Sequence, residues 1–395
     1  MINLHLLRNC WLEIDIDNIK NNYNEIIKFK KPNVKVMAVV KANAYGHGII
    51  QCSKILEECK ADILGVGNAK EGIKLRNNNI KLPILIFASN LIKEVGSVYS
   101  ENNLIPTILT YEQAKVMSDI PSNKPHSIFI KIETGRGRIG VNAEEMIDFV
   151  KKIKELPNIS IGGVYSHMAD ANWADISGKY SLWQYERFKR FIEELKNNGI
   201  QIPFLQLANS GGLIAYPEIQ LTGVAPGSTL WGYSALEKRE EHPNLKSVLL
   251  SWKSRLLQVK ETMGGKYGEK FKAIRLKRPK RIGVIAGGLS DGIDHKQAIG
   301  GEVLIRGRRV PIASSISIEH SIVDLSDFPE ATIGDEVVIY GKQGTEEITL
   351  DEICKLWDRT PLEFLTSLNL NLERVYFKDN AIYSCDTGGE LKTLQ

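Results

Sequence analysis

The chain has 395 residues, of which 43% are hydrophobic and 25% are charged, and its net charge is +4. This composition excludes a disordered chain, and no apolar run is long enough for a membrane-spanning helix. The five cysteines are scattered without a Cys-x-x-Cys pair, which argues against a disulfide framework or a zinc ribbon. The opening residues lack the basic and apolar regions of an export signal, so we expect a cytoplasmic protein without a membrane partner.

The first 245 residues alternate short runs rich in β-branched residues with longer helical patterns. A helix is predicted at 143–156, where apolar residues recur at helical spacing, and another at 181–199, which ends in Asn-Asn-Gly. The expected strands cover 34–41, 62–67, 83–87, 104–109, 127–132, 159–167, 203–207 and 219–224. Eight strand-helix alternations in about 245 residues are typical of a TIM-like (β/α)8 barrel.

After residue 246 the pattern changes to short strands separated by polar turns, followed by a helical stretch from Leu350 and a final strand at 373–377. The short strands are expected within 254–262, 280–288, 301–312, 320–327 and 334–344. We therefore predict an α/β protein with two domains: a barrel over residues 1–245 and a predominantly β domain over 246–395.

Two other patterns favour structural roles. The basic run 272–281 carries Ile274 and Leu276 at strand spacing, which favours a solvated strand face over nucleic-acid binding. His320 stands beside Glu319, but no third ligand has convincing spacing, so we predict no metal site there. Neither a nucleic-acid partner nor a metal is expected.

Lys41 is the first residue whose position suggests chemistry. An apolar strand runs into it and leaves through Ala-Asn-Ala-Tyr-Gly-His-Gly, and reactive groups of α/β barrels lie at the C-terminal ends of strands. Burial lowers the pKa of an amine and makes it a nucleophile toward an aldehyde, which is the chemistry of pyridoxal phosphate. Taken alone, the position is better explained by a lysine that only reaches solvent at a strand end.

The string VKANAYGHG around Lys41 resembles the cofactor-lysine motif of the alanine racemase family, the fold-type III pyridoxal-phosphate enzymes. Further segments resemble the family in the same order along residues 9 to 378, so the chain is similar to a diverged member. These segments are KIETGRGRIG (131–140), GGVYSHMADA (162–171), LANSGG (207–212), VAPGSTLWG (224–232), GGLSDG (287–292), GGEVLIRGRRVPI (300–312), SISIEHSIVDLS (315–326) and GDEVVIYGKQG (334–344).

The resemblance implies roles for individual residues. Lys41 would hold pyridoxal 5'-phosphate as a Schiff base and transfer protons, with Arg138 and His167 as further catalytic and cofactor-binding residues. Lys131, which is carbamylated in many family members, would orient Arg138 near the cofactor's phenolic oxygen and the substrate carboxylate. The remaining cofactor contacts would come from Tyr45, Asn209, Ser210, Gly227 and Ser228. The resemblance also implies a small amino-acid substrate and a homodimer with shared active sites.

The chain departs from the family at positions that face the chemistry. Leu289 stands where the family has the catalytic tyrosine of the partner subunit, and leucine can neither donate nor accept a proton. Ala225 replaces an arginine that bonds the pyridine nitrogen, and Leu370 replaces a phosphate-binding tyrosine. Ile318 and Glu319 replace a methionine and an aspartate in the substrate loop. His167 thereby loses both of the family's relay neighbours.

Three functions are compatible with these residues. The first is an amino-acid racemase in which His167, Ser290 or a water replaces the tyrosine, because a released histidine is expected to titrate near neutrality. The second is an enzyme of the same fold that needs one proton-transfer face, for decarboxylation, aldol cleavage, elimination or stereospecific proton exchange. The third is a non-catalytic paralogue that only holds the cofactor.

Overall fold

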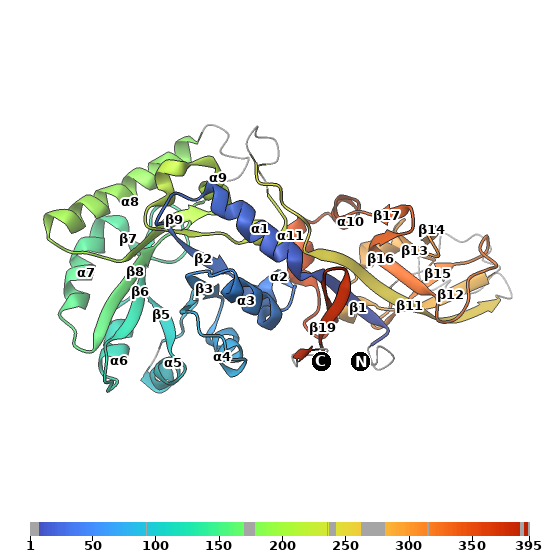
Figure 1. The fold of residues 1–395 in the computed structure, drawn as a ribbon, viewed down its shortest axis with the longest axis horizontal. Helices are drawn as coiled ribbons and strands as arrows, with labels where there is room; N and C mark the ends of the chain where they lie inside the picture. The colour runs from blue at the N-terminus through green and yellow to red at the C-terminus, as the bar shows by residue number, and fades with distance from the viewer. Residues whose placement is uncertain are drawn as a thin grey trace. The chain divides into compact units, whose positions relative to one another are not determined.

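The protein is described from a computed structural model over residues 8–91, 93–169, 178–234, 236, 242–261, 281–313, 316–387 and 391–393. Residues 272–280 of the basic run lie outside the described residues. The chain forms two compact units, each described by itself below (Figure 1). We call Asn18–Ala44 with Ile49–Lys246 the barrel unit, and Met1–Asp17 with Tyr45–Gly48 and Ser247–Gln395 the sheet unit.

Eight parallel strands form a closed ring in the barrel unit, in the order β2-β3-β4-β5-β6-β8-β9-β10. The ring closes where β10 pairs with β2, with Gly223 opposite Lys35. The strands are β2 (Lys35–Val39), β3 (Ile63–Val66), β4 (Ile84–Ile86), β5 (Leu104–Ile108), β6 (His126–Glu133), β8 (Ile159–Tyr165), β9 (Phe204–Asn209) and β10 (Gly223–Ala225). The predicted barrel is therefore confirmed, and a short β7 (Val141–Asn142) pairs with β6 outside the ring.

The strand expected at 219–224 is wrong in its first half. A 3-10 turn occupies Pro217–Gln220, and β10 begins only at Gly223. Pro217 has no backbone N–H for a ladder, and Leu221 has a φ of 47°, which is incompatible with an extended strand. The apolar run was therefore a poor guide to where the strand starts.

Each strand of the ring contributes one side chain to the hydrophobic core inside the barrel. These side chains are Met37, Ile63, Leu85, Ile105, Phe129, Tyr165, Phe204 and Ala225. Residues two apart on a strand face the same side. Lys131, two residues after Phe129, and Gln206, two residues after Phe204, therefore also face the barrel interior.

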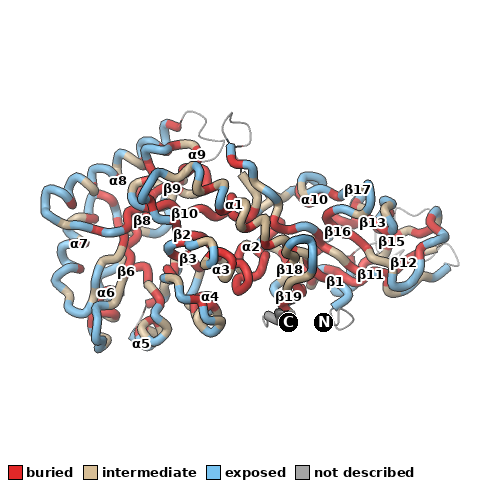
Figure 2. The backbone as a smooth tube through the Cα atoms, viewed as in Figure 1, coloured by how far each residue is buried: buried red, intermediate tan, exposed pale blue. Residues whose placement is uncertain are grey.

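The helices of the barrel lie outside the strands and bury one face (Figure 1). In α8, the buried residues Gln184, Phe188, Phe191 and Leu195 recur at spacings of three and four, as one helical face requires. Figure 2 shows exposed stretches along these helices and buried stretches along the strands. The helices are α1 (Ile16–Phe29), α3 (Ile49–Glu58), α4 (Ala69–Asn77), α5 (Gly96–Glu101), α6 (Tyr111–Ser118), α7 (Met146–Lys154), α8 (Lys179–Asn197) and α9 (Ser210–Ala215).

The sheet unit is built on one large sheet with the path β14-β13-β16-β11-β1-β18-β19-β20, from which β12, β15 and β17 branch. Its strands are β1 (Cys10–Asp15), β11 (Leu249–Glu261), β12 (Arg281–Ala286), β13 (Glu302–Ile305), β14 (Arg308–Pro311), β15 (His320–Asp324), β16 (Glu336–Gln343), β17 (Glu346–Ile348), β18 (Glu373–Lys378), β19 (Ala381–Asp386) and β20 (Leu391–Thr393). The expected final strand, β18, is followed by two more strands. The N-terminal β1 pairs with β11 and β18, so this sheet takes a strand from the start of the chain, and the exact domain boundary stays a prediction.

The predicted helical stretch after Leu350 consists of α10 (Leu350–Trp357) and α11 (Pro361–Ser367). Thr349 caps α10, and Thr360 with Glu363 forms a capping box on α11, which satisfies backbone N–H groups that the helices cannot pair. Across the described part of the chain, no helix combines the length and the apolar character needed to cross a membrane.

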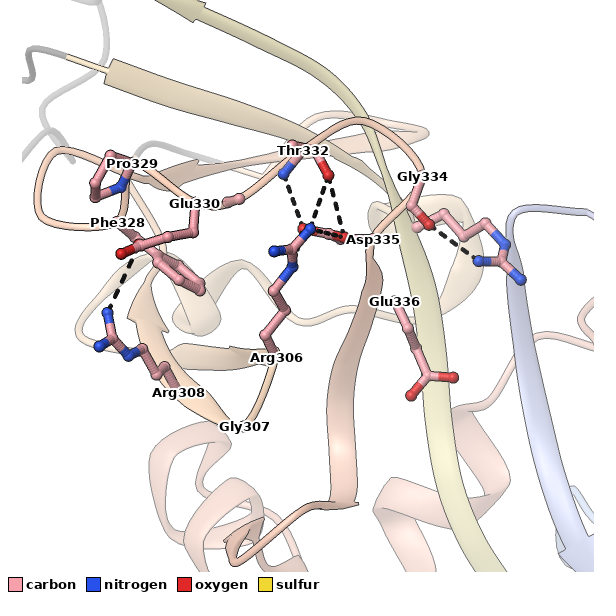
Figure 3. Close-up of polar contacts among 12 residues, drawn as sticks. Arg306, Gly307, Arg308, Phe328, Pro329, Glu330, Thr332, Gly334, Asp335 and Glu336 are labelled. Atoms are coloured by element: carbon pink, nitrogen blue, oxygen red, sulfur yellow. Dashed lines mark hydrogen bonds and ion pairs between the residues drawn. The ribbon is translucent and has the colours of Figure 1, made fainter.

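Arginines anchor the loop between β15 and β16 (Figure 3). Both carboxylate oxygens of Asp335 accept hydrogen bonds from Arg306, at 2.8 and 2.9 Å. Arg255 donates to the Gly334 carbonyl at 3.0 Å, and Arg308 lies 3.9 Å from the Glu330 carboxylate. These contacts fix a loop of the sheet unit, and we assign them no role in chemistry.

Candidate active site

The turn that follows β2 carries Lys41 in an unusual backbone conformation. Ala42, Asn43 and Ala44 have φ values of 54°, in the left-handed region that costs a non-glycine residue about 1–2 kcal/mol. Glu71 helps to hold this turn, because its carboxylate accepts hydrogen bonds from the backbone N–H groups of Gly67 at 2.7 Å and Asn43 at 3.1 Å. These hydrogen bonds fix the backbone of the turn that carries Lys41.

The Lys41 amine is partly buried and lies 5.9 Å from the centre of the Phe87 ring. Burial lowers the pKa of Lys41, the positive charge of Arg138 lowers it further, and the negative charge of Glu71 opposes both. The fraction of neutral amine at neutral pH is therefore larger than for an ordinary lysine. A neutral amine is the nucleophilic form.

Lys131 is a second lysine whose charge is disfavoured. It is 5% exposed, and its ammonium lies 4.7 Å from the centre of the Tyr165 ring. Burial lowers the pKa of Lys131 to about 7, with a further contribution from Arg138. At neutral pH, a large share of the molecules therefore carries a neutral amine inside the barrel.

Arg138 stands on an exposed turn that Glu133 organises. The Glu133 carboxylate accepts hydrogen bonds from the backbone N–H groups of Gly135 at 2.5 Å and Arg138 at 3.1 Å. Burial acts to raise the pKa of Glu133, but these backbone donors outweigh it and lower the pKa. A permanent carboxylate thus fixes the backbone of the turn and leaves the arginine side chain available.

His167 follows β8 and is neutral in this environment. Burial, followed by the charges of Lys131 and Arg138, lowers the pKa of His167 to about 3. Gln184 fixes the backbone here: its amide nitrogen donates to the His167 carbonyl at 3.4 Å, and its oxygen accepts from Ala169 N–H at 2.8 Å. The expected titration near neutrality is therefore not found, because burial and neighbouring cations disfavour the charged imidazole.

Ser210 and the β10 loop form a compact polar cluster. The Ser210 hydroxyl oxygen accepts hydrogen bonds from Gly227 N–H at 2.9 Å and from the Thr229 hydroxyl at 3.1 Å. In these bonds Ser210 only accepts, so its own proton can be donated to an anionic oxygen. Ser228 begins the following 3-10 turn, and the Asn209 side chain caps α9 by accepting from Gly212 N–H at 3.0 Å.

The segment Tyr45–Gly48 belongs to the sheet unit, where β18 holds it. The fully buried Arg374 donates to the Gly46 carbonyl at 2.7 Å, and the Tyr376 hydroxyl donates to the His47 carbonyl at 3.2 Å. Gly46 has a φ of 87°, and a Cβ there would lie 2.3 Å from the Leu365 carbonyl oxygen, so only glycine fits. Burial raises the pKa of Tyr45 to about 12, which keeps its phenol protonated as a donor.

The predicted substrate loop of the sheet unit is exposed and carries both apolar and charged side chains. Leu289 donates its backbone N–H to the Ser317 carbonyl at 2.9 Å, and Ser290 donates to the Ile318 carbonyl at 2.8 Å, so the two loops run together. The side chains of Leu289, Ile318 and Leu370 are 48%, 69% and 65% exposed. The backbone carbonyl of Glu319 accepts a hydrogen bond from Gly287 N–H.

The barrel unit therefore brings several predicted residues close enough to interact electrostatically: Lys41, Lys131 and Arg138 each lower the pKa of at least one other residue of this group, and all three lower that of His167. Ala225 also faces the barrel core, as its strand position requires. The residues Tyr45, Leu289, Ile318, Glu319 and Leu370 belong to the sheet unit. Within the described residues, no group of three or more His, Cys, Asp or Glu side chains is arranged to hold a metal ion.

Sequence reasoning missed the residues that support the lysines. Glu71 lies three residues after the helix cap Asn68, a spacing typical of a helix start. Tyr165 is the last residue of β8 and precedes His167 by two residues. Glu133 ends β6, two residues after Lys131. Examining the polar residue at the end of each of these strands would have found Tyr165 and Glu133.

Comparisons with known proteins cover almost the whole chain. Residues 14–235 match the family described as alanine racemase, N-terminal domain, and residues 249–376 match alanine racemase, C-terminal domain. An alanine racemase of Methanococcus maripaludis is 35% identical over 373 residues, which covers 93% of this chain and 98% of the relative. One of Halothermothrix orenii is 33% identical over 380 residues, covering 95% of this chain and 98% of the relative.

Solved structures of the same family have a similar fold. Alanine racemase from Bacillus anthracis with bound L-Ala-P aligns with a TM-score of 0.87 and 27% identity, covering 97% of this chain and 98% of that one. Alanine racemase from Clostridium difficile 630 aligns with a TM-score of 0.86 and 27% identity, covering 96% and 98% of the two chains.

Proposed function

Because the chain belongs to the alanine racemase family, we propose that it is a pyridoxal-phosphate-dependent amino-acid racemase with an altered second proton-transfer group and an altered substrate. The observation that carries this proposal is the desolvated Lys41 amine at the end of a barrel strand, among Lys131 and Arg138. A cationic barrel of this kind suits a ligand with a phosphate and a substrate with a carboxylate.

The polar groups described above fit pyridoxal phosphate. Lys41 would hold the aldehyde, while the free proton of the Ser210 hydroxyl and the phenol of Tyr45 are donors for phosphate oxygens. Gly227, Ser228 and Asn209 complete the proposed cofactor-binding set. When bound, the cofactor supplies an aldehyde that reacts with amines and a conjugated ring that stabilises negative charge at a substrate's α-carbon.

Different side chains of the protein would bind the substrate and transfer protons. Lys41, in its neutral form, accepts a proton from the α-carbon on one face and returns it. Arg138 pairs with the substrate carboxylate. His167 is partly buried, and its pKa of about 3 keeps it neutral, so it accepts or donates a hydrogen bond rather than carrying a charge.

Lys131 is proposed to be carbamylated. A neutral lysine amine adds to carbon dioxide, forming an N–C bond and releasing a proton, and the product is an anion. The pKa of about 7 favours the reactive neutral amine, and the anion would face the positive charge of Arg138. Intact-protein mass measured in bicarbonate and in CO2-free buffer tests this modification.

A second function is supported by the chemistry of Leu289 and His167, which the resemblance implies would lie opposite Lys41. Leu289 cannot move a proton, and the low pKa of His167 makes its imidazole a weak base. Chemistry that needs only Lys41 as the proton-transfer group is compatible with both findings. Decarboxylation, aldol cleavage, elimination and stereospecific α-proton exchange are of this kind.

The two functions are separated by incubating the protein with pyridoxal phosphate and a panel of single-enantiomer amino acids in deuterium oxide. Deuterium in both enantiomers of one amino acid supports racemisation. Exchange with retention of configuration, or release of carbon dioxide or an aldehyde, supports the one-face reaction. Bound cofactor without any exchange or product would overturn both and leave a cofactor-holding protein. The panel must extend beyond alanine, because Ile318 and Glu319 alter the predicted substrate loop.

We also propose a homodimer with shared active sites. The support in this chain is that Leu289, Ile318 and Leu370 are exposed apolar side chains on segments of the sheet unit that hydrogen-bond to one another, because exposed apolar side chains on adjoining segments commonly mark an interface. Sedimentation of the cofactor-bound protein tests this proposal, and a fully active monomer would contradict it.

A further inference from the structure

Gln206 is a buried polar side chain to which the proposed mechanism assigns no role. It lies on β9, is 0% exposed, and faces the barrel interior on the same side as Phe204. It pairs with Tyr165 of β8 and Gly223 of β10, and Tyr165 pairs in turn with Lys131 of β6. Because directly paired residues of parallel strands point to the same face, Lys131, Tyr165 and Gln206 share one layer of the barrel.

The two ends of the Gln206 amide have different surroundings. The nitrogen donates to the Ala208 carbonyl at 2.9 Å, which identifies it as the nitrogen, since a carbonyl only accepts. The side-chain oxygen is buried and has no hydrogen-bond partner among the described residues. A buried acceptor without a donor is unfavourable and is rare in folded proteins.

The neighbouring strands do not provide the missing donor. On β10, Gly223 has no side chain and Ala225 presents a methyl group. On β8, the Tyr165 hydroxyl lies 2.8 Å from the Thr107 hydroxyl, and Thr107 uses its own proton on the Ile86 carbonyl at 2.7 Å. Tyr165 must therefore donate to Thr107, and its proton is not available to Gln206.

We infer that the Gln206 side-chain oxygen accepts a hydrogen bond from the protonated ring nitrogen of bound pyridoxal phosphate. This inference rests on the proposed function, because it requires that Lys41 holds the cofactor. An amide oxygen can only accept, so the ring nitrogen must carry the proton. Gln206 is then a positioning residue that favours the pyridinium form, in which the ring withdraws electrons more strongly from a substrate.

The binding test compares pyridoxal phosphate with an analogue in which a C–H group replaces the ring nitrogen. The natural protein should bind the analogue more weakly by roughly three- to tenfold, the contribution of one hydrogen bond. Gln206→Met should bind both compounds equally. Gln220→Met is the matched control, because Gln220 is also fully buried but its oxygen already accepts from Lys31 N–H at 2.7 Å. This control should retain the discrimination of the natural protein.

A second measurement can already overturn the inference in the natural protein, without any variant. Pyridoxal phosphate labelled with nitrogen-15 in the ring reports its protonation by NMR in the natural protein. A protonated ring nitrogen that loses its proton in Gln206→Met supports the inference. An unprotonated ring in the natural protein, or equal discrimination against the analogue in Gln206→Met, overturns it and leaves the oxygen to a water molecule. Failure of pyridoxal phosphate itself to bind at Lys41 would instead overturn the proposed function.

Discussion

The barrel interior around Lys41 and the exposed loop around Leu289 differ in the side chains that they contribute. In the barrel, two lysines are buried near an arginine, and burial lowers the pKa of both Lys41 and Lys131. In the loop, Leu289 and Ile318 present apolar side chains to the surface of the sheet unit. The first region is suited to move protons and bind anions, whereas the second is suited to shape a pocket or bury an interface. The barrel region therefore contributes the lysine that we propose to transfer protons, whereas Leu289 can neither donate nor accept a proton.

Among the substitutions that test this comparison, Lys41→Ala should have the largest effect. It should abolish the visible absorption of bound pyridoxal phosphate and reduce turnover by at least about a thousandfold, because the proposed attachment point and proton carrier are both lost. Absorption spectra and steady-state kinetics measure the two effects. Lys35→Ala, on the same strand but exposed, should leave both unchanged. A normal cofactor spectrum in Lys41→Ala would refute the assignment.

The next largest effect concerns Arg374 and Tyr376, which donate hydrogen bonds to the carbonyl groups of Gly46 and His47. We call this pair of side chains the clamp. Arg374→Met leaves several buried carbonyl groups without their donor and should lower the free energy of unfolding by about 3 kcal/mol. Tyr376→Phe removes one bond to His47 and should lower it by about 1 kcal/mol. Urea unfolding measures both changes.

The same two variants should weaken pyridoxal-phosphate binding in the same order, because Tyr45 begins the clamped segment. Equilibrium dialysis of the cofactor provides the measurement. Unchanged cofactor affinity in a destabilised Arg374→Met protein would show that the clamp serves the fold alone.

The apolar loop is tested by Ile318→Glu. If a second copy covers this loop, a buried carboxylate should raise the dimer dissociation constant by at least about tenfold, seen by sedimentation at several concentrations. Ile333→Glu is a matched control, because Ile333 is 66% exposed and lies in the arginine-held loop of Figure 3. Equal effects of the two substitutions would argue against a dimer interface at Ile318.

Lys131 gives a pH-dependent prediction. Its pKa falls from an ordinary 10.5 to about 7 in the folded chain, so the unfolded chain binds more protons across this interval. The contribution of Lys131 to the free energy of unfolding should therefore increase as pH rises from about 7 toward about 10.5. Lys131→Met should remove this contribution in CO2-free buffer, measured by urea unfolding at several pH values, whereas exposed Lys151→Met should not.

The smallest expected effect is that of Glu71→Gln. The amide keeps one oxygen, so it can accept from only one of the Gly67 and Asn43 N–H groups, and the negative charge that raises the pKa of Lys41 is lost. The pH at which the cofactor-free protein captures pyridoxal phosphate should move down by a few tenths of a unit, consistent with one partly screened charge. A shift toward higher pH would contradict the assigned influence of Glu71.

The sequence by itself predicted the eight barrel strands, a helical stretch after Leu350 and the position of Lys41 at a strand end. Those features depend on hydrophobic periodicity and on local turn and capping residues, both of which are visible within a few residues. The resemblance of residues 287–292 to the family also predicts that Leu289 stands in place of a proton-transfer residue, and leucine can neither donate nor accept a proton.

Only the tertiary structure decided which groups share an environment. The low pKa of His167 arises from burial and from cations on other elements, which no local pattern contains. The membership of β1 in the sheet of the C-terminal unit depends on pairing with β11 and β18, more than two hundred residues away along the chain. The unpartnered oxygen of Gln206 appears only once the neighbouring strands are in register, because a missing donor is a property of the packed barrel rather than of the sequence.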